Sequence, residues 1–290
     1  MAPSARRKAD ESGKSGGSGW VLVTGASAGI GRELARVFAS KGRDLVLLAR
    51  SHETTTELAR ELVAKNGVNV KTIPADLSVP GAAEAIFEGL SAKGISVDIL
   101  VNNAGVLFEG DFSSIPLEDH LRLLQINVVA LTALSRLFLP SMLLRRSGRI
   151  LNVASTAAFM PVPRLAAYAA AKAYVLSLTE ALSEELRGSG VTATALCPGF
   201  TDTSMMRGSR LGKSVPSVMV MSPAAVAEQG CAACLAGETI CIPGLANKLI
   251  ALLPRALVRG VGGMINGEGL GRIASAWRSR APPSDKESSR

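Results

Sequence analysis

Short apolar segments alternate with longer segments of helical spacing along the chain from residue 20 onward. The apolar segments have the length of strands buried on both faces, and they occupy residues 20–25, 44–50, 68–77, 97–105, 148–155, 191–199 and, as a short seventh, 238–244. The helical segments lie between them, and the clearest are residues 31–42, 53–67, 82–94, 117–145 and 166–187. This alternation predicts an α/β protein with a doubly wound parallel sheet of about seven strands and helices on both faces.

A length of 290 residues fits one large domain, and a hydrophobic content of 47% supplies its core. We expect residues 1–18 to form a disordered leader, because glycine, serine and charged residues dominate them. Residues 19–244 are expected to form the domain, with integral substrate loops at about residues 199–222. Residues 245–290 are expected to add a C-terminal helix and a basic, partly disordered tail.

The positive charge is concentrated at the two ends of the chain. Residues 1–19 contribute +2 and residues 255–290 contribute +4 to the formal net charge of +8. The part between them lacks the basic field that nucleic-acid binding requires, so no nucleic-acid partner is expected. The first residues lack the apolar core of a secretory signal, and no uncharged apolar run reaches the length of a membrane span. We therefore expect a cytoplasmic protein, with organelle targeting as an alternative.

The segment that begins at residue 245 combines an apolar stripe with Lys248, Arg255 and Arg259. One interpretation is peripheral contact with a membrane surface. The other is packing over the substrate entrance or a subunit boundary. The sequence leaves both open.

The four cysteines do not form a disulfide framework in a chain of this size, and they indicate a reducing compartment. Two of them, in CAAC at residues 231–234, raise the question of a redox or zinc site. This motif lies in an alanine-rich helical stretch, and no further ligands stand at zinc-finger spacing. We therefore interpret Cys231 and Cys234 as core residues and predict no metal site.

A glycine-rich turn, TGASAGIG at residues 24–31, joins the first predicted strand to the first predicted helix. Gly25 permits a tight turn, Gly29 lets the backbone approach a pyrophosphate, and Gly31 allows the helix to pack closely on the strand. The spacing differs from the GxGxxG of the commonest dinucleotide-binding turn. Its position after the first strand nevertheless predicts a dinucleotide site.

The second predicted strand ends at Ala49 and Arg50, where an NAD site needs a carboxylate for the ribose hydroxyls. An arginine instead presents donors that suit a 2′-phosphate. The sequence therefore favours NADP(H) over NAD(H), with a merely solvated Arg50 as the alternative. The fourth strand closes with NNAG, residues 102–105, whose two amides can pin neighbouring loops.

The segment AAYAAAKAYV, residues 166–175, places Tyr168 and Lys172 on one face of a helix, roughly 40° apart. An ammonium beside a phenol favours the phenolate, so we expect a Tyr168 pKa lowered toward neutrality, as a general acid or base requires. A half-buried tyrosine and a snorkelling lysine are the alternative for this pair alone. Ser155 ends a strand and can hold a substrate oxygen. Asn127 is an amide in an apolar setting, and a bound water between it and Lys172 would satisfy it.

These motifs and PGFTDT at residues 198–203, in this order and spacing, resemble the short-chain dehydrogenase/reductase family in its compact single-domain branch, over about residues 19–244. The resemblance implies a Rossmann-type fold. It implies that Tyr168 is the catalytic acid/base, that Lys172 lowers its pKa and binds the nicotinamide ribose, and that Ser155 orients the carbonyl. Asn127 would hold a proton-relay water. The implied cofactor site consists of Gly25, Ser27, Gly29, Ile30, Gly31, Arg50, Asp76, Leu77, Asn103, Ala104, Gly105, Tyr168, Lys172, Pro198, Gly199 and Thr201, with Asp76 at the adenine.

The implied reaction is hydride transfer between the nicotinamide of NADP(H) and a carbonyl or secondary alcohol. The loops that would form the substrate pocket carry apolar side chains that suggest a lipophilic ketone or 3-oxoacyl substrate: Phe159, Met160, Val162, Met205 and Met206. A non-catalytic NADP-binding regulator or scaffold of the same fold is the alternative, and the complete acid/base set favours an enzyme. The long apolar helices resemble those with which the family forms homodimers or homotetramers, so a homo-oligomer is expected.

Overall fold

The computed structural model of the protein describes residues 19–209, 215 and 217–252. Seven strands form one parallel sheet in the order β3-β2-β1-β4-β5-β6-β7. They are β1 (Trp20–Thr24), β2 (Leu45–Ala49), β3 (Val70–Pro74), β4 (Val97–Asn102), β5 (Gly148–Val153), β6 (Val191–Leu196) and β7 (Ile240–Cys241). The predicted Rossmann-type doubly wound sheet is confirmed. The predicted leader, and the predicted tail beyond residue 252, lie outside the described residues.

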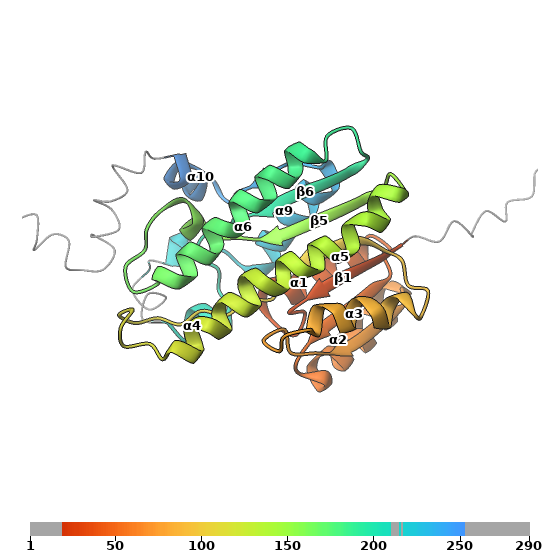
Figure 1. The fold of residues 1–290 in the computed structure, drawn as a ribbon, viewed down its shortest axis with the longest axis horizontal. Helices are drawn as coiled ribbons and strands as arrows, with labels where there is room; N and C mark the ends of the chain where they lie inside the picture. The colour runs from red at the N-terminus through yellow and green to blue at the C-terminus, as the bar shows by residue number, and fades with distance from the viewer. Residues whose placement is uncertain (1–18, 210–214, 216, 253–290) are drawn as a thin grey trace, which may run out of the picture.

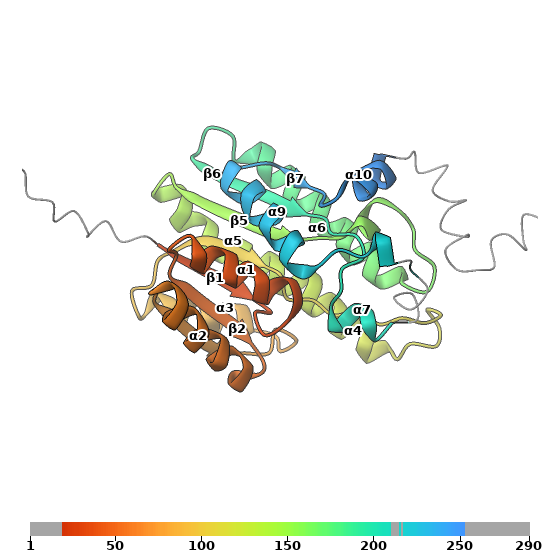
Figure 2. The same ribbon diagram turned by 180° about the vertical axis from the view of Figure 1, so that it is seen from behind.

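Helices join the strands and cover both faces of the sheet. The longer ones are α1 (Gly29–Ser40), α2 (His52–Asn66), α3 (Ala82–Ser91), α4 (Leu117–Leu124), α5 (Leu131–Leu144), α6 (Ala166–Glu185), α9 (Pro223–Ala236) and α10 (Leu245–Leu252). Helices α3, α5 and α6 lie in front of the sheet in Figure 1, and α1, α2 and α9 lie in front of it in the reverse view of Figure 2. Short segments complete the set: η1 (Gln125–Ala130), η2 (Thr156–Phe159), α7 (Ser204–Arg207) and η3 (Ser217–Met219).

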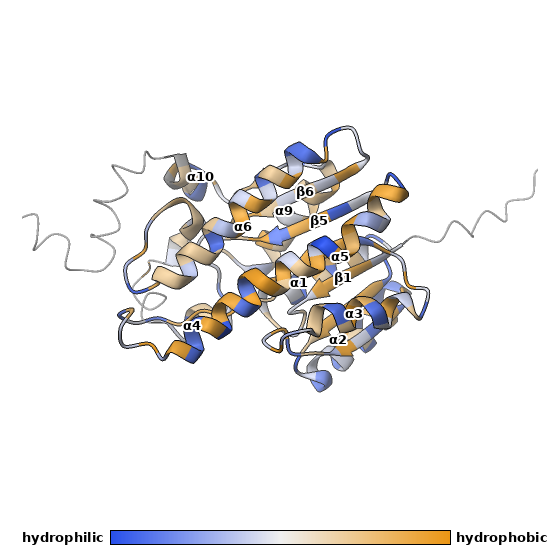
Figure 3. Cartoon of the chain, viewed as in Figure 1, coloured by the Kyte–Doolittle hydropathy of each residue, from blue (hydrophilic) through white to orange (hydrophobic). Residues whose placement is uncertain are grey.

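The core consists of aliphatic side chains on both faces of the sheet, as the low aromatic content of 4% requires. In β1, Val21 and Val23 pack toward α1 and α9, while Leu22 packs toward α3 and α5. The strands are mostly apolar, and hydrophilic residues lie mainly on the helices and loops, although β5 also contains hydrophilic positions (Figure 3). Each face therefore holds its helices by burial of apolar area.

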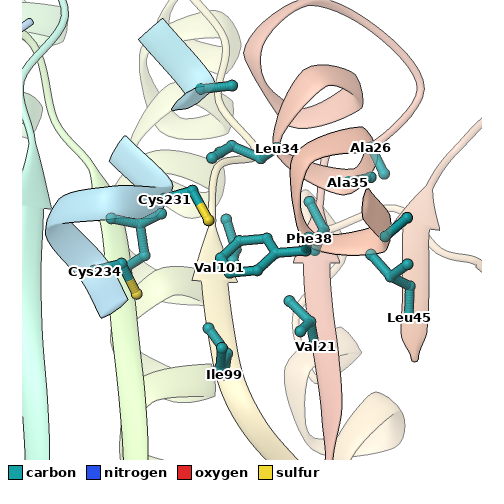
Figure 4. Packing of buried hydrophobic residues seen from close by; sticks show 14 of the residues in the cluster. Val21, Ala26, Leu34, Ala35, Phe38, Leu45, Ile99, Val101, Cys231 and Cys234 are labelled. Atoms are coloured by element: carbon teal, nitrogen blue, oxygen red, sulfur yellow. The ribbon is translucent and has the colours of Figure 1, made fainter. Parts of the chain in front are cut away.

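Cys231 and Cys234 belong to this core. Both side chains are fully buried on α9, in the cluster that contains Phe38 of α1 and Val101 of β4 (Figure 4). Burial raises the pKa of Cys231 to about 11 and that of Cys234 to about 12, which keeps both thiols protonated and unreactive. The interpretation of CAAC as core packing is confirmed.

The segment predicted as one long helix at residues 117–145 is helical throughout but not uniform. Between α4 and α5, the η1 segment is π-helical, and it contains Asn127. The combined helix, Leu117–Leu144, is long and apolar enough to cross a membrane by length and composition alone. Within the fold it packs on the sheet through Leu134, Phe138 and Met142, all buried.

The carboxyl ends of the strands point toward the side of the molecule on which α4 and α10 lie (Figure 1). Helix α10 contacts η2, the turn that follows β5. This contact is compatible with packing over the substrate entrance, while Leu245 and Leu249 are exposed, as contact with a membrane or another subunit would require, so both interpretations stay open. Arg255 and Arg259 lie outside the described residues.

Candidate active site

One cavity of about 650 Å³ lies where the turns after β1, β2, β3, β4, β5 and β6 meet. Its walls bring together sixteen of the predicted site residues: Gly25, Ser27, Gly29, Ile30, Arg50, Asp76, Leu77, Asn103, Ala104, Gly105, Ser155, Tyr168, Lys172, Pro198, Gly199 and Thr201. Gly31 and Asn127 do not line it and lie behind its walls. A volume of this size suits a cofactor or a drug-sized ligand.

The glycine-rich turn forms one end of the cavity. Gly25 adopts a φ of +66°, the left-handed conformation that favours glycine. A Cβ on Gly31 would overlap the side-chain amide of Asn103 and the carbonyl oxygen of Gly25. Asn103 holds this turn from the neighbouring strand, because its Nδ2 donates to the carbonyl oxygens of Thr24 (2.9 Å) and Gly25 (3.2 Å).

The turn leads into the N-terminus of α1, which no side chain caps and whose first turn contains no acidic residue. Its backbone N–H groups and the positive end of the helix dipole are therefore available to an anion. Together with the close approach at Gly31, this suits the pyrophosphate of a dinucleotide.

Arg50 and Asp76 lie at the ends of β2 and β3. The Arg50 side chain is exposed at the cavity. The Asp76 carboxylate accepts a hydrogen bond from the backbone N–H of Ser78 (2.9 Å), which lowers the pKa of Asp76, and the charge of Arg50 lowers it further. This end of the cavity thus presents one cation and one ionised carboxylate for an adenosine moiety.

Tyr168, Lys172 and Ser155 converge at the other end. The Lys172 ammonium lies 5.7 Å from the centroid of the Tyr168 ring, and its Nζ donates to the carbonyl oxygen of Val153 at 2.7 Å. The Ser155 hydroxyl accepts a hydrogen bond from the backbone N–H of Ala157 (3.1 Å). The spacing of four residues on α6 therefore places both side chains beside the end of β5, as expected.

The direction of the predicted Tyr168 pKa shift is wrong for the protein described here. Burial is the largest effect and raises the Tyr168 pKa, because a phenolate loses its hydration, while a hydrogen bond with Ser155 partly opposes this. Lys172 is itself buried, and burial lowers its pKa from 10.5 to about 8. The pair is thus a neutral phenol beside an ammonium that loses its proton more easily than an exposed lysine, and not a phenolate beside a lysine of ordinary pKa.

Asn127 lies behind the cavity wall and holds the backbone of Val106, which lines the cavity. Its Oδ1 accepts from the backbone N–H of Val106 (2.9 Å), and its Nδ2 donates to the carbonyl oxygen of the same residue (3.0 Å). A Cβ on Gly105 would stand 3.3 Å from Asn127 Oδ1 and 3.6 Å from Lys172 Nζ, so both groups converge beside Gly105. The expected water between Asn127 and Lys172 remains a prediction.

The substrate side of the cavity is apolar. Met160, Val162, Met205 and Met206 line it, as their positions in the two loops suggested. Phe159 does not line it, because its side chain turns to the core and packs against the apolar cluster around Val175. That part of the pocket prediction is wrong.

Several wall residues were not predicted from the sequence, namely Val106, Leu107, Leu165 and Asn247. Apolar loop residues of this kind resemble any core residue. Asn247 is different, since it is one of few polar residues in an apolar C-terminal segment, and that contrast could have marked it.

A buried polar network ties the central strands to the helices of the site. Asn102 Nδ2 donates to Ser135 Oγ on α5 (3.0 Å) and to Asn152 Oδ1 on β5 (2.9 Å). Asn152 Nδ2 in turn donates to Thr179 Oγ1 on α6 (2.9 Å). The network fixes both helices relative to β4 and β5, whose carboxyl ends carry the site.

Comparison with known proteins places this geometry in a family. The model of the short chain dehydrogenase family matches residues 19–214. The very-long-chain 3-oxoacyl-CoA reductase of Rattus norvegicus is 33% identical over 240 residues, which cover 81% of this chain and 76% of the rat protein.

Two solved structures have the same fold over most of the chain. A short-chain dehydrogenase from Sphingobium yanoikuyae in complex with NADPH is 29% identical, with a TM-score of 0.73 over 93% of this chain and 98% of that one. A bulky-bulky ketone specific alcohol dehydrogenase from Comamonas testosteroni is 26% identical, with a TM-score of 0.70 over 93% of this chain and 97% of that one. The chain belongs to the short-chain dehydrogenase/reductase family, and it is an oxidoreductase enzyme with a nicotinamide-cofactor fold.

Proposed function

We propose that the protein is an NADP(H)-dependent reductase of lipophilic ketones or 3-oxoacyl compounds. The observation that carries this proposal is the meeting of Ser155, Tyr168 and Lys172 in the same cavity as the glycine-rich turn, with methionine side chains on the remaining wall. In the reverse direction the same site oxidises a secondary alcohol.

The bound cofactor supplies a hydride from its nicotinamide ring. Ser155 and Tyr168 orient the substrate carbonyl by donating hydrogen bonds to its oxygen. Tyr168 would give its phenolic proton to that oxygen, so that the hydride at the carbon and the proton at the oxygen together make the alcohol. Lys172 stabilises the phenolate that remains, and a water held near Asn127 returns the proton.

Reduction needs an acid, and burial keeps Tyr168 in its protonated phenol form, although the same raised pKa makes that phenol a weaker proton donor. Because the pKa of Lys172 is about 8, a nearby anion can shift the balance between its charged and neutral forms near neutral pH. Since the cofactor carries phosphates, binding is expected to hold Lys172 protonated.

The preference for NADP(H) rests on Arg50. The end of β2 offers no carboxylate to a ribose hydroxyl, and the exposed guanidinium beside the cavity suits a phosphate. The Sphingobium relative, which binds NADPH, supports the same preference.

The substrate class rests on the apolar wall and on the relatives. Met160, Met205, Met206 and Met219 are flexible apolar side chains that adapt to a long aliphatic or bulky group. The names of the rat and Comamonas relatives point to 3-oxoacyl and bulky ketone substrates.

We also propose a homo-oligomer. The outer side of the long helix carries Leu117, Leu121, Leu124 and Val129, all at least 40% exposed, and Tyr174 on α6 is exposed nearby and pairs with Thr132. Light scattering after gel filtration tests this directly, and a monomer at micromolar concentration contradicts it.

The test of function is a titration of the purified protein with NADPH and NADH, followed by NADPH oxidation against ketones and 3-oxoacyl thioesters of increasing chain length. We expect tighter binding of NADPH and turnover that rises with chain length. Arg50→Asp should weaken NADPH binding about 10- to 100-fold, the value of one or two charge-assisted hydrogen bonds, and leave NADH nearly unchanged. If the ratio of the NADPH and NADH dissociation constants is the same in Arg50→Asp as in wild type, Arg50 does not bind the 2′-phosphate. If the wild-type protein binds neither nucleotide, the proposal is refuted.

A further inference from the structure

Helix α10 has its polar and apolar residues on the opposite sides from those expected of a surface helix. Its Asn247 is buried and lines the cavity, whereas Leu245 and Leu249 are 80% and 68% exposed. Residues 245 and 249 share one face of the helix, and residue 247 lies on the opposite face. A surface helix of a soluble protein normally turns its apolar face to the core. The outer face of α10 therefore presents leucines that an apolar partner can cover.

These two leucines belong to a larger group of exposed apolar side chains around the cavity opening. Met205 on α7 lines the cavity and is itself 41% exposed, so it stands at the opening. Phe112, in the loop before α4, is 65% exposed. That loop is fastened to the cavity loop after η2, because the N–H of Gly110 donates to the carbonyl oxygen of Arg164 (3.0 Å) and Asp111 pairs with Arg164 (3.2 Å). We call the four exposed side chains the apolar rim: Phe112, Met205, Leu245 and Leu249.

The elements that carry the apolar rim lie at one end of the molecule. Figure 1 shows α4 and α10 at the left, and the reverse view of Figure 2 shows α4, α7 and α10 together at the right. The rim is therefore one face of the protein, and the cavity opens on it.

Positive charge accompanies the apolar rim. Lys248 is exposed on α10 between the two leucines. The described chain ends on this helix at residue 252, and residues 255–290, which come after it, contribute +4 to the net charge by sequence. Exposed apolar side chains next to cationic groups are the combination with which peripheral proteins bind anionic lipids.

A second copy of the chain suits this face less well than a lipid does. A two-fold contact through the rim would bring the two copies of Lys248 and of the basic segment 255–290 together, and like charges repel. An anionic bilayer instead offers acyl chains to the leucines and negative headgroups to the cations. We propose that the apolar rim docks on the surface of an anionic lipid membrane.

Docking in this orientation sets the cavity opening against the lipid. Met205 belongs both to the rim and to the cavity wall, so a lipophilic molecule can pass from the bilayer to the methionine-lined wall without crossing water. This consequence rests on the function proposed above, and it favours substrates with long aliphatic chains that partition into membranes. The docking itself depends only on the rim and its charge.

The test is flotation of the full-length protein with vesicles of phosphatidylcholine, with and without phosphatidylserine. We expect wild-type protein to bind the vesicles that contain phosphatidylserine, and to bind them more weakly when salt screens the attraction. A double variant, Leu245→Ser with Leu249→Ser, should bind these vesicles about 10- to 100-fold more weakly, as loss of two partly inserted leucine side chains predicts. Equal melting temperatures confirm that the variants are folded.

Leu144→Ser is the matched control. Leu144 is 88% exposed, and it lies at the C-terminal end of α5, at the opposite end of the molecule from α10 (Figure 1). This variant should bind vesicles as wild type does. Lys248→Glu should weaken binding to vesicles that contain phosphatidylserine and leave binding to pure phosphatidylcholine nearly unchanged.

Three results overturn the inference. The first is wild-type protein that does not float with vesicles that contain phosphatidylserine, and the second is a double variant that binds them as tightly as wild type. The third is a double variant that loses subunits in light scattering without lipid while wild type ignores the vesicles, since the rim is then a contact between copies. Protein that floats with vesicles but binds no nucleotide refutes the proposed function instead, so the two failures are distinguishable.

Discussion

Replacing Gly31 by alanine sets two physical effects against each other. Gly31 lies in the first turn of α1, where alanine is favoured over glycine by about 0.5–1 kcal/mol through helix propensity alone. The new Cβ, however, would overlap the carbonyl oxygen of Gly25 and the amide of Asn103, and it would stand 3.0 Å from the Gly25 carbonyl carbon. The overlapping oxygen belongs to the backbone, so the turn itself must move.

The structure gives the magnitude. Overpacking of a tight contact costs about 1–3 kcal/mol. Displacement of Asn103 also puts at risk its hydrogen bonds to Thr24 and Gly25, each worth about 0.5–1.5 kcal/mol. After the propensity gain is subtracted, Gly31→Ala should destabilise the protein by about 1–4 kcal/mol, or roughly 2–4 °C in melting temperature for each kcal/mol.

Thermal melts of wild-type protein, Gly31→Ala and Gly89→Ala, with and without NADPH, measure this. Gly89 lies inside α3, and a Cβ there meets no atom within 4 Å, so Gly89→Ala should raise the melting temperature slightly. Gly31→Ala should lower it and also shrink the stabilisation that NADPH provides, because the moved turn no longer fits the pyrophosphate. If Gly31→Ala behaves like Gly89→Ala in both respects, close packing at this turn is not what the nucleotide site needs.

Three further predictions concern the charged and acidic groups of the site and its rim. Tyr168→Phe should lower kcat by at least about 100-fold while it still binds NADPH as wild type does. If the variant oxidises NADPH as fast as wild type, Tyr168 is not the proton donor. Lys172→Met should abolish turnover, yet its free energy of unfolding at pH 7 should be no lower than that of wild type. Burial lowers the Lys172 pKa from 10.5 to about 8, so keeping the charged lysine buried costs the folded state about 3 kcal/mol, and the uncharged methionine avoids this cost. This cost is present in full below pH 8. Between pH 8 and 10.5 the folded protein loses the Lys172 proton while the unfolded chain keeps it, so the cost decreases as the pH rises. The free energies of unfolding of the two proteins, measured by urea melts, should therefore converge toward pH 10.5. Asp111→Ala should change stability by less than about 1 kcal/mol, because its ion pair with Arg164 (3.2 Å) is largely exposed, and a larger loss in urea melts would mean that this loop contact is structural.

The fold could be predicted from the sequence because its signals are local and repeated. Strands buried on both faces are continuous apolar runs, and the helices between them carry the 3.6-residue period, so the element order followed directly. The residues of the nucleotide wall also lie in strand-end turns, where position alone places them together.

The features that could not be predicted depend on packing between distant segments. Nothing in QINVVA indicates the π-helical turn around Asn127, since its residues suit an ordinary helix equally well. The predicted direction of the Tyr168 pKa shift was wrong because burial, which depends on the whole fold, raises the pKa and outweighs the opposing hydrogen bond with Ser155. Phe159 lies in the correct loop but turns to the core, and a loop sequence does not determine that choice.

The sheet order has a consequence for synthesis on the ribosome. Strands β1 to β4 are neighbours in space and contiguous in sequence, so the turns after β1, β2, β3 and β4 that line the cavity are complete by about residue 105, whereas α10 brings Asn247 much later. At about 5–20 residues per second, roughly 7–30 s separate the two events. During translation the turns on the β1–β4 side of the cavity therefore emerge before the segments that carry Ser155, Tyr168 and Lys172, so the acid/base end of the cavity is completed last.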